Sequence, residues 1–373
     1  MSVSRISALG AIALSGALAL SACASENTSN TTSPAGSGTA AGSSAECFTG
    51  DLKAEGSSAQ KNAIDEAISA FQNVCTDANI DYQPTGSGAG IKQFIAKQVD
   101  FAGSDSALKT EQKDGAIESE DAAKACASPA WNLPMVTGPI AIAYNVAGVD
   151  KLVLNADVAA KIFDGKIAAW NDPAIAALNS GVTLPSKPIK VYFRSDESGT
   201  TENFTKYLKA AAPEAWSYET GKKWTGKGEG KEKSAGVATA TKGQDGGITY
   251  VELSYAQQNS LKMAAIDSGS GPVELTAESA GKTVATAEQT GTGNDLALKI
   301  DYATKEAGAY PIVLVTYEIV CSKGLAADKL PLVKGFLGHA ASTAGQADLT
   351  ELGYAPLPES VRAKVETAVK NLA

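Results

Sequence analysis

Strand-like and helix-like segments alternate through most of this chain of 373 residues. The segments 79–83 and 189–193 are short and contain strand-forming residues, whereas 57–74 places Ile64, Ile68 and Phe71 on one face of a helix. Such alternation is typical of βαβ units around a parallel sheet, so the sequence predicts an α/β fold. At this length more than one hydrophobic core is expected, and therefore two lobes.

The predicted elements divide the chain between these lobes. We expect strands at 47–53, 79–83, 101–103, 133–145, 189–193, 247–252 and 312–320. We expect helices at 57–74, 91–98, 157–163, 170–178, 201–211, 330–342 and 359–372. The chain would cross between lobes near Tyr144 and Ile312. Lobe I is thus predicted over 46–144 and 313–373, and lobe II over 145–312, with a hinge at the crossings.

The N-terminus predicts export. Residues 6–20 are apolar and uncharged but too short to span a bilayer, which indicates a signal peptide over 1–22. Cys23 follows Leu-Ser-Ala, which resembles the bacterial lipoprotein box and implies a lipid on Cys23; an ordinary secretory signal is the alternative. Residues 23–45 are mostly small and polar, as in a flexible tether. We expect anchoring to the outer face of the cytoplasmic membrane, at the cell surface or in a periplasm.

Four other cysteines are present, an even number that suggests two disulfides with three conceivable pairings. An antiparallel pairing of 133–145 with 312–320 would favour Cys126–Cys321, which leaves Cys47–Cys75. The chain has no Cys-x-x-Cys pair, so no metal site is predicted. The sole histidine, His339, is expected to be structural. A net charge of −9 argues against a nucleic-acid partner.

Two strand-to-helix connections have the composition of an anion site. Residues 85–90 form a glycine-rich loop around Ser87, and residues 194–201 carry a second loop before another helix. Helix N-termini offer free N–H groups and a positive dipole end to an anion. Ser198 and Thr200 can donate hydroxyl hydrogens and Gly199 its N–H. The alternatives are an ordinary loop and an N-capping serine.

Charged residues beside these loops predict how an anion would be recognised. Arg194 can bind a tetrahedral oxyanion with two parallel hydrogen bonds, and Asp196 can hold its guanidinium in place. Asp105 ends a third strand, where a carboxylate suits an anion that still carries a proton. Phosphate has such a proton near neutral pH and sulfate does not, so Asp105 would exclude sulfate. An N-cap is the alternative role of Asp105.

The ordered motifs resemble the phosphate-binding protein of the phosphate ABC transporter, the PstS family. They are Gly-Ser-Gly-x-Gly at 86–90, Val-Asp-Phe-x-x-Ser-Asp at 99–105 and Arg-x-Asp-x-Ser-Gly-Thr at 194–200. Further similar segments are 162–173, 178–179, 248–252 and 354–358. The resemblance implies a hinged, two-lobed periplasmic-binding-protein fold with phosphate in the cleft between the lobes.

The resemblance also implies a ligand set and partners. The phosphate ligands would be Ser87, Asp105, Arg194, Ser198, Gly199 and Thr200, with Asp196 orienting the arginine. The partners would be inorganic phosphate and membrane permease subunits that work with a separate ATPase. We expect a monomer without cofactor or metal, and no enzymatic activity.

Three segments fit this pattern poorly. The family begins with Gly-x-Gly-x-Thr-Phe, whereas residues 54–59 read Ala-Glu-Gly-Ser-Ser-Ala, so contacts from Ser58 and Ala59 are expected but weakly indicated. Residues 226–236 are lysine-rich, and no role is assigned to them. Residues 276–283 end like a phosphate-binding P-loop but lack its first glycine, so no nucleotide site is predicted.

Other functions stay open at this point. The chain could bind sulfate, molybdate or arsenate, and a protonated arsenate would pass the Asp105 filter. A secreted phosphatase-like enzyme would need a metal cluster or an activated nucleophile, for which the sequence offers few groups. A surface adhesin with a vestigial pocket is a third alternative.

Overall fold

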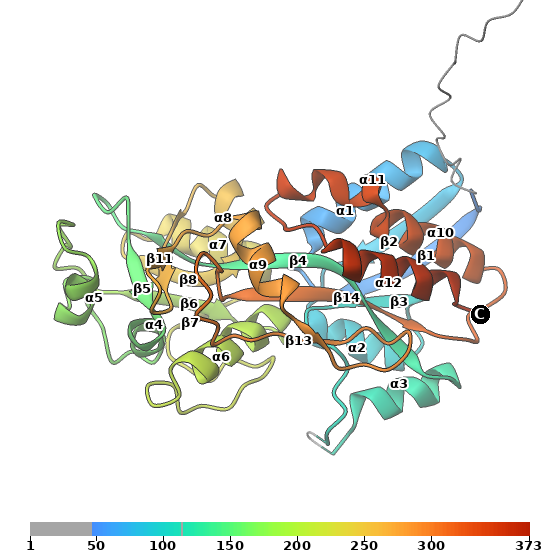
Figure 1. Ribbon diagram of the computed structural model, residues 1–373, viewed down its shortest axis with the longest axis horizontal. Helices are drawn as coiled ribbons and strands as arrows, with labels where there is room; N and C mark the ends of the chain where they lie inside the picture. The colour runs from blue at the N-terminus through green and yellow to red at the C-terminus, as the bar shows by residue number, and fades with distance from the viewer. Residues whose placement is uncertain (1–46, 113–114) are drawn as a thin grey trace, which may run out of the picture. The chain divides into compact units, whose positions relative to one another are not determined.

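Two antiparallel strands, β4 (Ala130–Asn145) and β14 (Val313–Cys321), run side by side through the middle of the fold in the computed structural model (Figure 1). The structure describes residues 47–373 except 113–114. Within this part, β4 and β14 belong to a nine-stranded sheet of order β2-β1-β3-β14-β4-β8-β6-β7, with β9 paired to β4. The sheet is mixed, because parallel strands lie on either side of this antiparallel pair.

The strands are β1 (Gly50–Gly56), β2 (Ala78–Gln83), β3 (Phe101–Ser104), β4, β5 (Val153–Asn155), β6 (Lys190–Arg194), β7 (Glu229–Lys231), β8 (Gly247–Glu252), β9 (Lys262–Met263), β10 (Ala265–Asp267), β11 (Pro272–Val273), β12 (Glu288–Gln289), β13 (Leu298–Lys299) and β14. The helices are α1 (Lys61–Val74), α2 (Ser87–Ile95), α3 (Glu118–Cys126), α4 (Ala156–Phe163), α5 (Pro173–Leu178), α6 (Gly199–Ala211), α7 (Lys233–Gly243), α8 (Leu253–Gln258), α9 (Ala277–Ala285), α10 (Leu330–Ala341), α11 (Thr343–Ala347), the 3-10 helix η1 (Asp348–Thr350) and α12 (Glu359–Lys370).

The β1–β3 end of the sheet is covered by helices on both faces. One core packs side chains of α1, α10 and α12 against β1, β2 and β4, with the ring of Phe336 in contact with those of Phe71 and Phe101. A smaller core packs α2, α3 and α9 against the opposite face of β3 and β14. Figure 1 shows α1 and α10 on one side of these strands and α2 and α3 on the other. Both faces are therefore buried, as parallel sheets require.

The β8–β6–β7 end has its own continuous core. It contains Trp170, Trp216, Phe163 and Phe204, all fully buried, with side chains from α4, α6, α7 and α8. The aromatic rings pack edge-on or stacked, with the centroids of Phe163 and Phe204 4.8 Å apart. Separate cores at the two ends of one sheet are the physical basis of the two-lobed α/β fold expected from the sequence.

Two disulfides lie at the β1–β3 end. Cys47 bonds to Cys75, which follows α1, and Cys126 at the end of α3 bonds to Cys321 at the end of β14. This is the pairing that the sequence analysis favoured. The second disulfide follows from strand register, because Cys321 is paired with Ala130 at the start of β4.

Several predicted boundaries were wrong. The helix expected over 57–74 begins at Lys61, because residues 57–60 form a separate turn. The helix expected over 91–98 begins at Ser87, so the glycine-rich loop is largely the first turn of α2. The helix expected over 170–178 begins at Pro173, in the position that suits a proline. Helices α3, α7, α8 and α9 were not predicted at all.

Cys23, the predicted signal peptide and the predicted tether precede the residues that the structure describes. The lobe boundaries at 144/145 and 312/313 stay a prediction. Among the described residues, no helix has both the length and the apolar composition needed to cross a membrane.

Candidate functional site

The candidate site lies where four strands end. Ser57 directly follows β1, Asp105 follows β3, Arg194 ends β6 and Glu252 ends β8. β1 and β3 are parallel to each other, and so are β6 and β8. The first pair runs antiparallel to the second, so the carboxyl ends of both pairs face each other near the middle of β4 and gather polar side chains from both ends of the sheet.

These side chains are buried although they are polar. The buried set comprises Ser57, Ser58, Ser87, Asp105, Arg194, Ser198, Thr200, Ser234 and Glu252, none more than 3% exposed. Burying polar groups is unfavourable unless each finds a partner. The partners therefore reveal what each group still has to offer a ligand.

Asp105 accepts hydrogen bonds from three hydroxyl groups. Ser57 Oγ and Thr316 Oγ1 donate to its Oδ1 at 2.5 and 2.8 Å, and Ser87 Oγ lies 3.1 Å from its Oδ2. A carboxylate has about four acceptor positions. Two on Oδ1 and one on Oδ2 are used by described residues, so one position on Oδ2 is left to accept a hydrogen from a ligand.

That free position lies beside the N-terminus of α6. A methyl group on Gly199 would come 2.5 Å from Asp105 Cβ, 2.7 Å from Asp105 Oδ2 and 2.6 Å from Ser87 Oγ. No side chain fits there, so only glycine allows the start of α6 to approach Asp105 and Ser87 so closely. Three predicted ligands, Ser87, Asp105 and Gly199, are thus brought together from opposite ends of the sheet.

Burial raises the pKa of Asp105 to about 6, although the hydrogen bond from Ser57 lowers it and the charge of Glu252 raises it further. The carboxylate is solvated by hydroxyl groups rather than by a cation. Such a group is costly to keep charged, and a hydrogen donated by a ligand would offset part of that cost.

Asp196 has the opposite environment. Its Oδ1 and Oδ2 accept from Arg194 Nε and Nη2 at 2.8 and 2.5 Å, a bidentate pair. Burial alone would raise the pKa of Asp196, but these bonds with Arg194 outweigh it and hold the pKa at about 2. Burial would lower the pKa of Arg194, and the same bonds raise it instead. Asp196 therefore orients Arg194 as a permanent cation.

The outer nitrogens of Arg194 point to hydroxyl groups. Nη1 donates to Ser234 Oγ at 3.0 Å and to Thr200 Oγ1 at 3.3 Å. One Nη2 hydrogen has no partner among the described residues and is free for an anion. Thr200 Oγ1 in turn donates to Glu252 Oε1 at 2.5 Å, which fixes the hydroxyl beside the guanidinium.

Three helices begin at this cluster within the described chain: α2 at Ser87, α6 at Gly199 and α7 at Lys233. The N–H of Gly88 donates to the Glu197 carbonyl at 3.0 Å, so α2 and α6 start side by side. Ser198 caps α6 by accepting from the Thr201 N–H at 3.2 Å, and its own hydroxyl hydrogen stays available. Helix N-termini attract anions through their free N–H groups and dipoles.

The turn at 57–59 is held by three buried tyrosines. The hydroxyls of Tyr82, Tyr255 and Tyr354 donate to the carbonyls of residues 57, 58 and 59 at 2.8, 3.1 and 2.7 Å respectively. The carbonyls are thereby turned away from the cluster. This turn is more constrained than its departure from the family pattern suggested.

Within that turn, the expected contact residues have partners of their own. Ser58 Oγ lies 3.0 Å from Ser234 Oγ, and the Ala59 N–H donates to Ser57 Oγ at 3.0 Å. Ser57, which the sequence analysis did not single out, is the residue that contacts Asp105. The turn is thus connected to Asp105 through Ser57 and to Arg194 through Ser58 and Ser234.

A second set of contacts lies one helical turn below the cluster. Asn203 Nδ2 donates to the Asp105 carbonyl at 2.7 Å, and Ser106 Oγ donates to Glu202 Oε2 at 3.0 Å. Glu202 is 1% exposed and also pairs with Lys109 and Lys206. These bonds fasten the Asp105 loop to α6.

Four residues of the cluster were missed from sequence: Ser57, Ser234, Glu252 and Thr316. Ser234 lies in the lysine-rich segment 226–236, to which no role was assigned, and the structure corrects that view. The one available signal was position: Ser57 and Glu252 both stand at strand ends. Nothing local marks Thr316, which lies inside β14.

The described residues hold no group of three or more His, Cys, Asp and Glu side chains placed to bind a metal. His339 lies on α10 against Phe71, with ring centroids 5.5 Å apart, and burial lowers its pKa. Thr276, at the start of the P-loop-like segment, caps α9 through a capping box with Ser279.

Comparison with known proteins identifies the family. Residues 28–343 match the PBP superfamily domain model. The chain is 45% identical over 381 aligned residues to the phosphate-binding protein PstS 3 of Mycobacterium tuberculosis, covering 100% of both chains. This chain belongs to the PstS family of phosphate-binding proteins. The family expected from the sequence motifs is thereby confirmed.

Solved PstS-like structures share the fold. PfluDING, a high-affinity periplasmic phosphate-binding protein solved with phosphate at pH 8.5, matches 85% of this chain and 93% of its own at a TM-score of 0.68 and 22% identity. A phosphate-binding protein from Stenotrophomonas maltophilia matches 85% of this chain and 93% of its own, at a TM-score of 0.67 and 19% identity. At these identities the similarity supports the two-lobed α/β fold.

Proposed function

We propose that this protein captures inorganic phosphate outside the cytoplasm and delivers it to the permease of an ABC importer. The observation that carries the proposal is the single free acceptor position on Asp105, placed beside the N-terminus of α6. The family membership, with relatives named as phosphate-binding proteins over the full chain, supports the same conclusion.

In this proposal each ligand residue has a distinct role. Arg194, the hydroxyl of Ser198 and the N–H groups at the starts of α2 and α6 donate to phosphate oxygens. Ser87 and Thr200 would donate as well once their hydroxyl hydrogens turn from Asp105 and Glu252 to the ligand. Asp105 accepts the proton of hydrogen phosphate. A fully deprotonated sulfate would place an oxygen lone pair against Asp105, which is unfavourable in a buried site. Ser58 and Ala59 would contribute through the turn that the three tyrosines hold.

The contacts between Asp105 and α6 suggest how binding closes the site. Asn203 and Glu202 of α6 hold the Asp105 loop, and Ser234 of α7 meets Ser58 of the first turn. We propose that these bonds form when the predicted lobes, 46–144 with 313–373 and 145–312, close on the anion. Closure would exclude water and create the surface that a permease recognises.

Calorimetric titration with phosphate, sulfate and molybdate tests the proposal. Phosphate should bind at pH 8, and sulfate and molybdate should bind at least about a hundredfold more weakly, since an unpaired buried charge costs about 3 kcal/mol. Sulfate binding as tight as phosphate binding would contradict the role given to Asp105. Arsenate, which carries a proton, should bind.

We further propose that the protein is not an enzyme. The serine hydroxyls nearest the site are already engaged with Asp105 or with a helix N-terminus, and the only histidine lies on α10. Incubation with a chromogenic phosphate ester should release no product. Turnover that is lost in Asp105→Asn would overturn this view.

The location outside the cytoplasm rests on the N-terminal sequence and on the family. We propose that Cys23 is the first mature residue and carries the lipid anchor, with residues 23–45 as the tether. Metabolic labelling with a radioactive fatty acid should mark the wild-type protein and leave Cys23→Ser unlabelled. Labelling of the Cys23→Ser protein would place the lipid elsewhere.

A further inference from the structure

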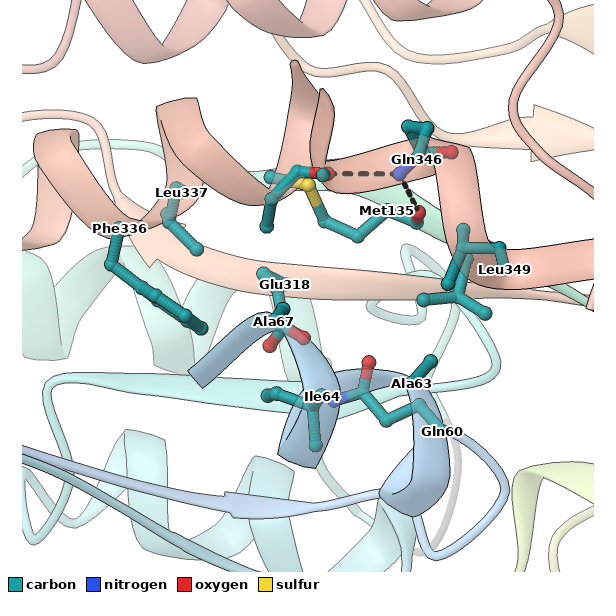
Figure 2. Close-up of a pocket in the computed structure, with 13 residues that line it drawn as sticks. Gln60, Ala63, Ile64, Ala67, Met135, Glu318, Phe336, Leu337, Gln346 and Leu349 are labelled. Carbon is teal, nitrogen blue, oxygen red and sulfur yellow. Dashed lines mark hydrogen bonds between the residues drawn. The ribbon is translucent and has the colours of Figure 1, made fainter. Parts of the chain in front are cut away.

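A small internal cavity lies behind the site, between α1, β14 and α10. Its volume is about 20 Å³, enough for one water molecule. Most of its lining is apolar, including Ile64, Met135, Phe336 and Leu349, but Gln60 from the turn before α1 and Glu318 from β14 also reach into it (Figure 2). A glutamate in such a setting requires an explanation.

Glu318 has an oxygen without a partner. It is 2% exposed, and its Oε2 has no hydrogen-bond partner among the described residues; the same holds for Oε1 of Gln60. Both atoms are acceptors as long as Glu318 is ionised. Two buried acceptor oxygens at one small cavity need a hydrogen donor, which is either a water that donates to both oxygens or a proton on Glu318 itself.

We propose that Glu318 is a neutral carboxylic acid in the folded protein and that it positions the first turn of the phosphate site. Its proton is donated to Gln60 Oε1, directly or through the one water that the cavity admits. Gln60 Nε2 donates to Tyr82 Oη at 3.0 Å, and Tyr82 donates to the Ser57 carbonyl at 2.8 Å. Ser57 Oγ then donates to Asp105, so a neutral Glu318 fixes the chain of bonds that ends at the ligand.

The surroundings of Glu318 favour the neutral form. No charged side chain lines the cavity from α1, β4, α10, α11 or η1, and the titratable groups that act on Glu318 are Asp105 and Tyr82. Burial raises the pKa of Glu318 to about 8, with the hydrogen bond from Gln60 lowering it and the charge of Asp105 raising it. The proposal itself stands on the two unpartnered oxygens and the apolar cavity.

The variant Glu318→Gln tests the inference, because its amide can donate to Gln60 without a titratable proton. Phosphate and Asp105 titrate in both proteins, so their effect on affinity largely cancels in the ratio of the wild-type Kd to the variant Kd. The pH dependence of this ratio then reports the titration of Glu318. We expect a ratio near one at pH 6 that rises about fivefold by pH 9, as for a one-unit rise in pKa on anion binding. Glu306→Gln, at an exposed glutamate, is the matched control and should give a flat ratio.

Two ligand-free measurements separate this inference from the proposed function on which it rests. The folding equilibrium constant of the wild type should fall relative to Glu318→Gln by about tenfold per pH unit between pH 4.5 and 8, because the folded state keeps a proton that the unfolded state has lost. The infrared carbonyl band of a neutral carboxylic acid should appear in the wild type at pH 7 and vanish in Glu318→Gln. A stability difference between the wild type and Glu318→Gln that does not change with pH would overturn the inference even if phosphate binds. A missing carbonyl band in the wild type would do the same. Failure to bind phosphate with both signals present would overturn only the proposed function.

Discussion

Two carboxylates, the buried Asp105 and the partly buried Asp196, stand at one site in opposite environments. Asp105 is surrounded by hydroxyl groups, and its pKa is raised to about 6. Asp196 forms a bidentate pair with Arg194, and its pKa is held at about 2. Burial raises the pKa of both carboxyl groups, so the difference between their pKa values comes from their hydrogen-bond partners. Asp196 is satisfied without a ligand, whereas Asp105 has one acceptor position left for a ligand.

Replacing Arg194 by Met should have the largest effect, because it removes the bidentate cationic partner of Asp196 and leaves only the Lys233 N–H at 2.9 Å and the Lys233 ammonium at 3.8 Å. Loss of one partner of a buried ion pair costs about 3–5 kcal/mol, and Lys233 offsets part of this cost. The free energy of unfolding should therefore fall by about 3 kcal/mol, and phosphate binding should be lost. Chemical denaturation and calorimetry would measure both. Arg194→Lys keeps the charge without the planar fork and should recover stability more than affinity. Wild-type affinity in Arg194→Met would rule out the guanidinium as a ligand.

Replacing Asp105 by Asn should change selectivity more than stability. The Asn amide can donate to a sulfate oxygen, so the preference for phosphate over sulfate should fall by about 2 kcal/mol, or roughly thirtyfold. Competition titrations of phosphate against sulfate would measure the change. The exposed Asp81→Asn provides a control of equal charge and should keep the preference. An unchanged preference in Asp105→Asn would mean that selectivity lies elsewhere.

A change of pH between 5 and 8 should change the protonation of Asp105 but not that of Asp196. Below pH 6 Asp105 gains a proton and can donate to sulfate, so sulfate affinity should rise at least about twentyfold from pH 8 to pH 5, while Asp196 stays ionised. Asp105 also binds its proton more tightly when folded than when unfolded, so the stability of the ligand-free protein should fall as pH rises from about 4 to 6. Asp105→Asn should remove the sulfate dependence, and the stability of the wild type relative to this variant should fall over the same pH range. A sulfate dependence that persists in Asp105→Asn, or a flat stability difference, would assign the effect to another group.

Ser234→Ala should give the smallest effect on the Arg194 side. Loss of one hydrogen bond to Arg194 Nη1 is worth about 1 kcal/mol, or roughly a fivefold weaker phosphate affinity. Calorimetry would resolve this difference, with the exposed Ser69→Ala of α1 as the control. If Ser234 also carries the contact between α7 and Ser58, the loss should appear as faster phosphate release in stopped-flow traces. Equal release rates would confine Ser234 to orienting the arginine.

The same contrast explains what could be predicted from the sequence. Arg194, Asp196 and Ser198 lie within one strand-loop-helix segment, so their roles follow from local pattern and chemistry. The partners of Asp105 come from distant segments: Ser57 is 48 positions away and Thr316 is 211 positions away. Such contacts depend on sheet register, which no local pattern encodes.

The missed helices have a similar cause. α7 contains Val237 as its only large aliphatic side chain, so its sequence shows no helical periodicity, and burial in the surrounding core stabilises it instead. Its N-terminus nevertheless supplies Ser234. The α/β fold was predictable because long apolar strands such as β14 dominate the pattern. The start of α1 was not, since the turn at 57–60 is held by tyrosines from elsewhere in the chain.

The Cys126–Cys321 disulfide has a topological consequence. Because β4 starts at Ala130, opposite Cys321, the segment between the two cysteines begins and ends at one point of the β1–β3 end of the sheet, where the disulfide joins its two ends. That segment contains Arg194, α6 and α7, whereas Asp105 precedes it. The cationic part of the site could therefore be exchanged between related chains as one segment, with Ser57, Ser87 and Asp105 left in place, provided that the new segment keeps the hydroxyl of Thr316.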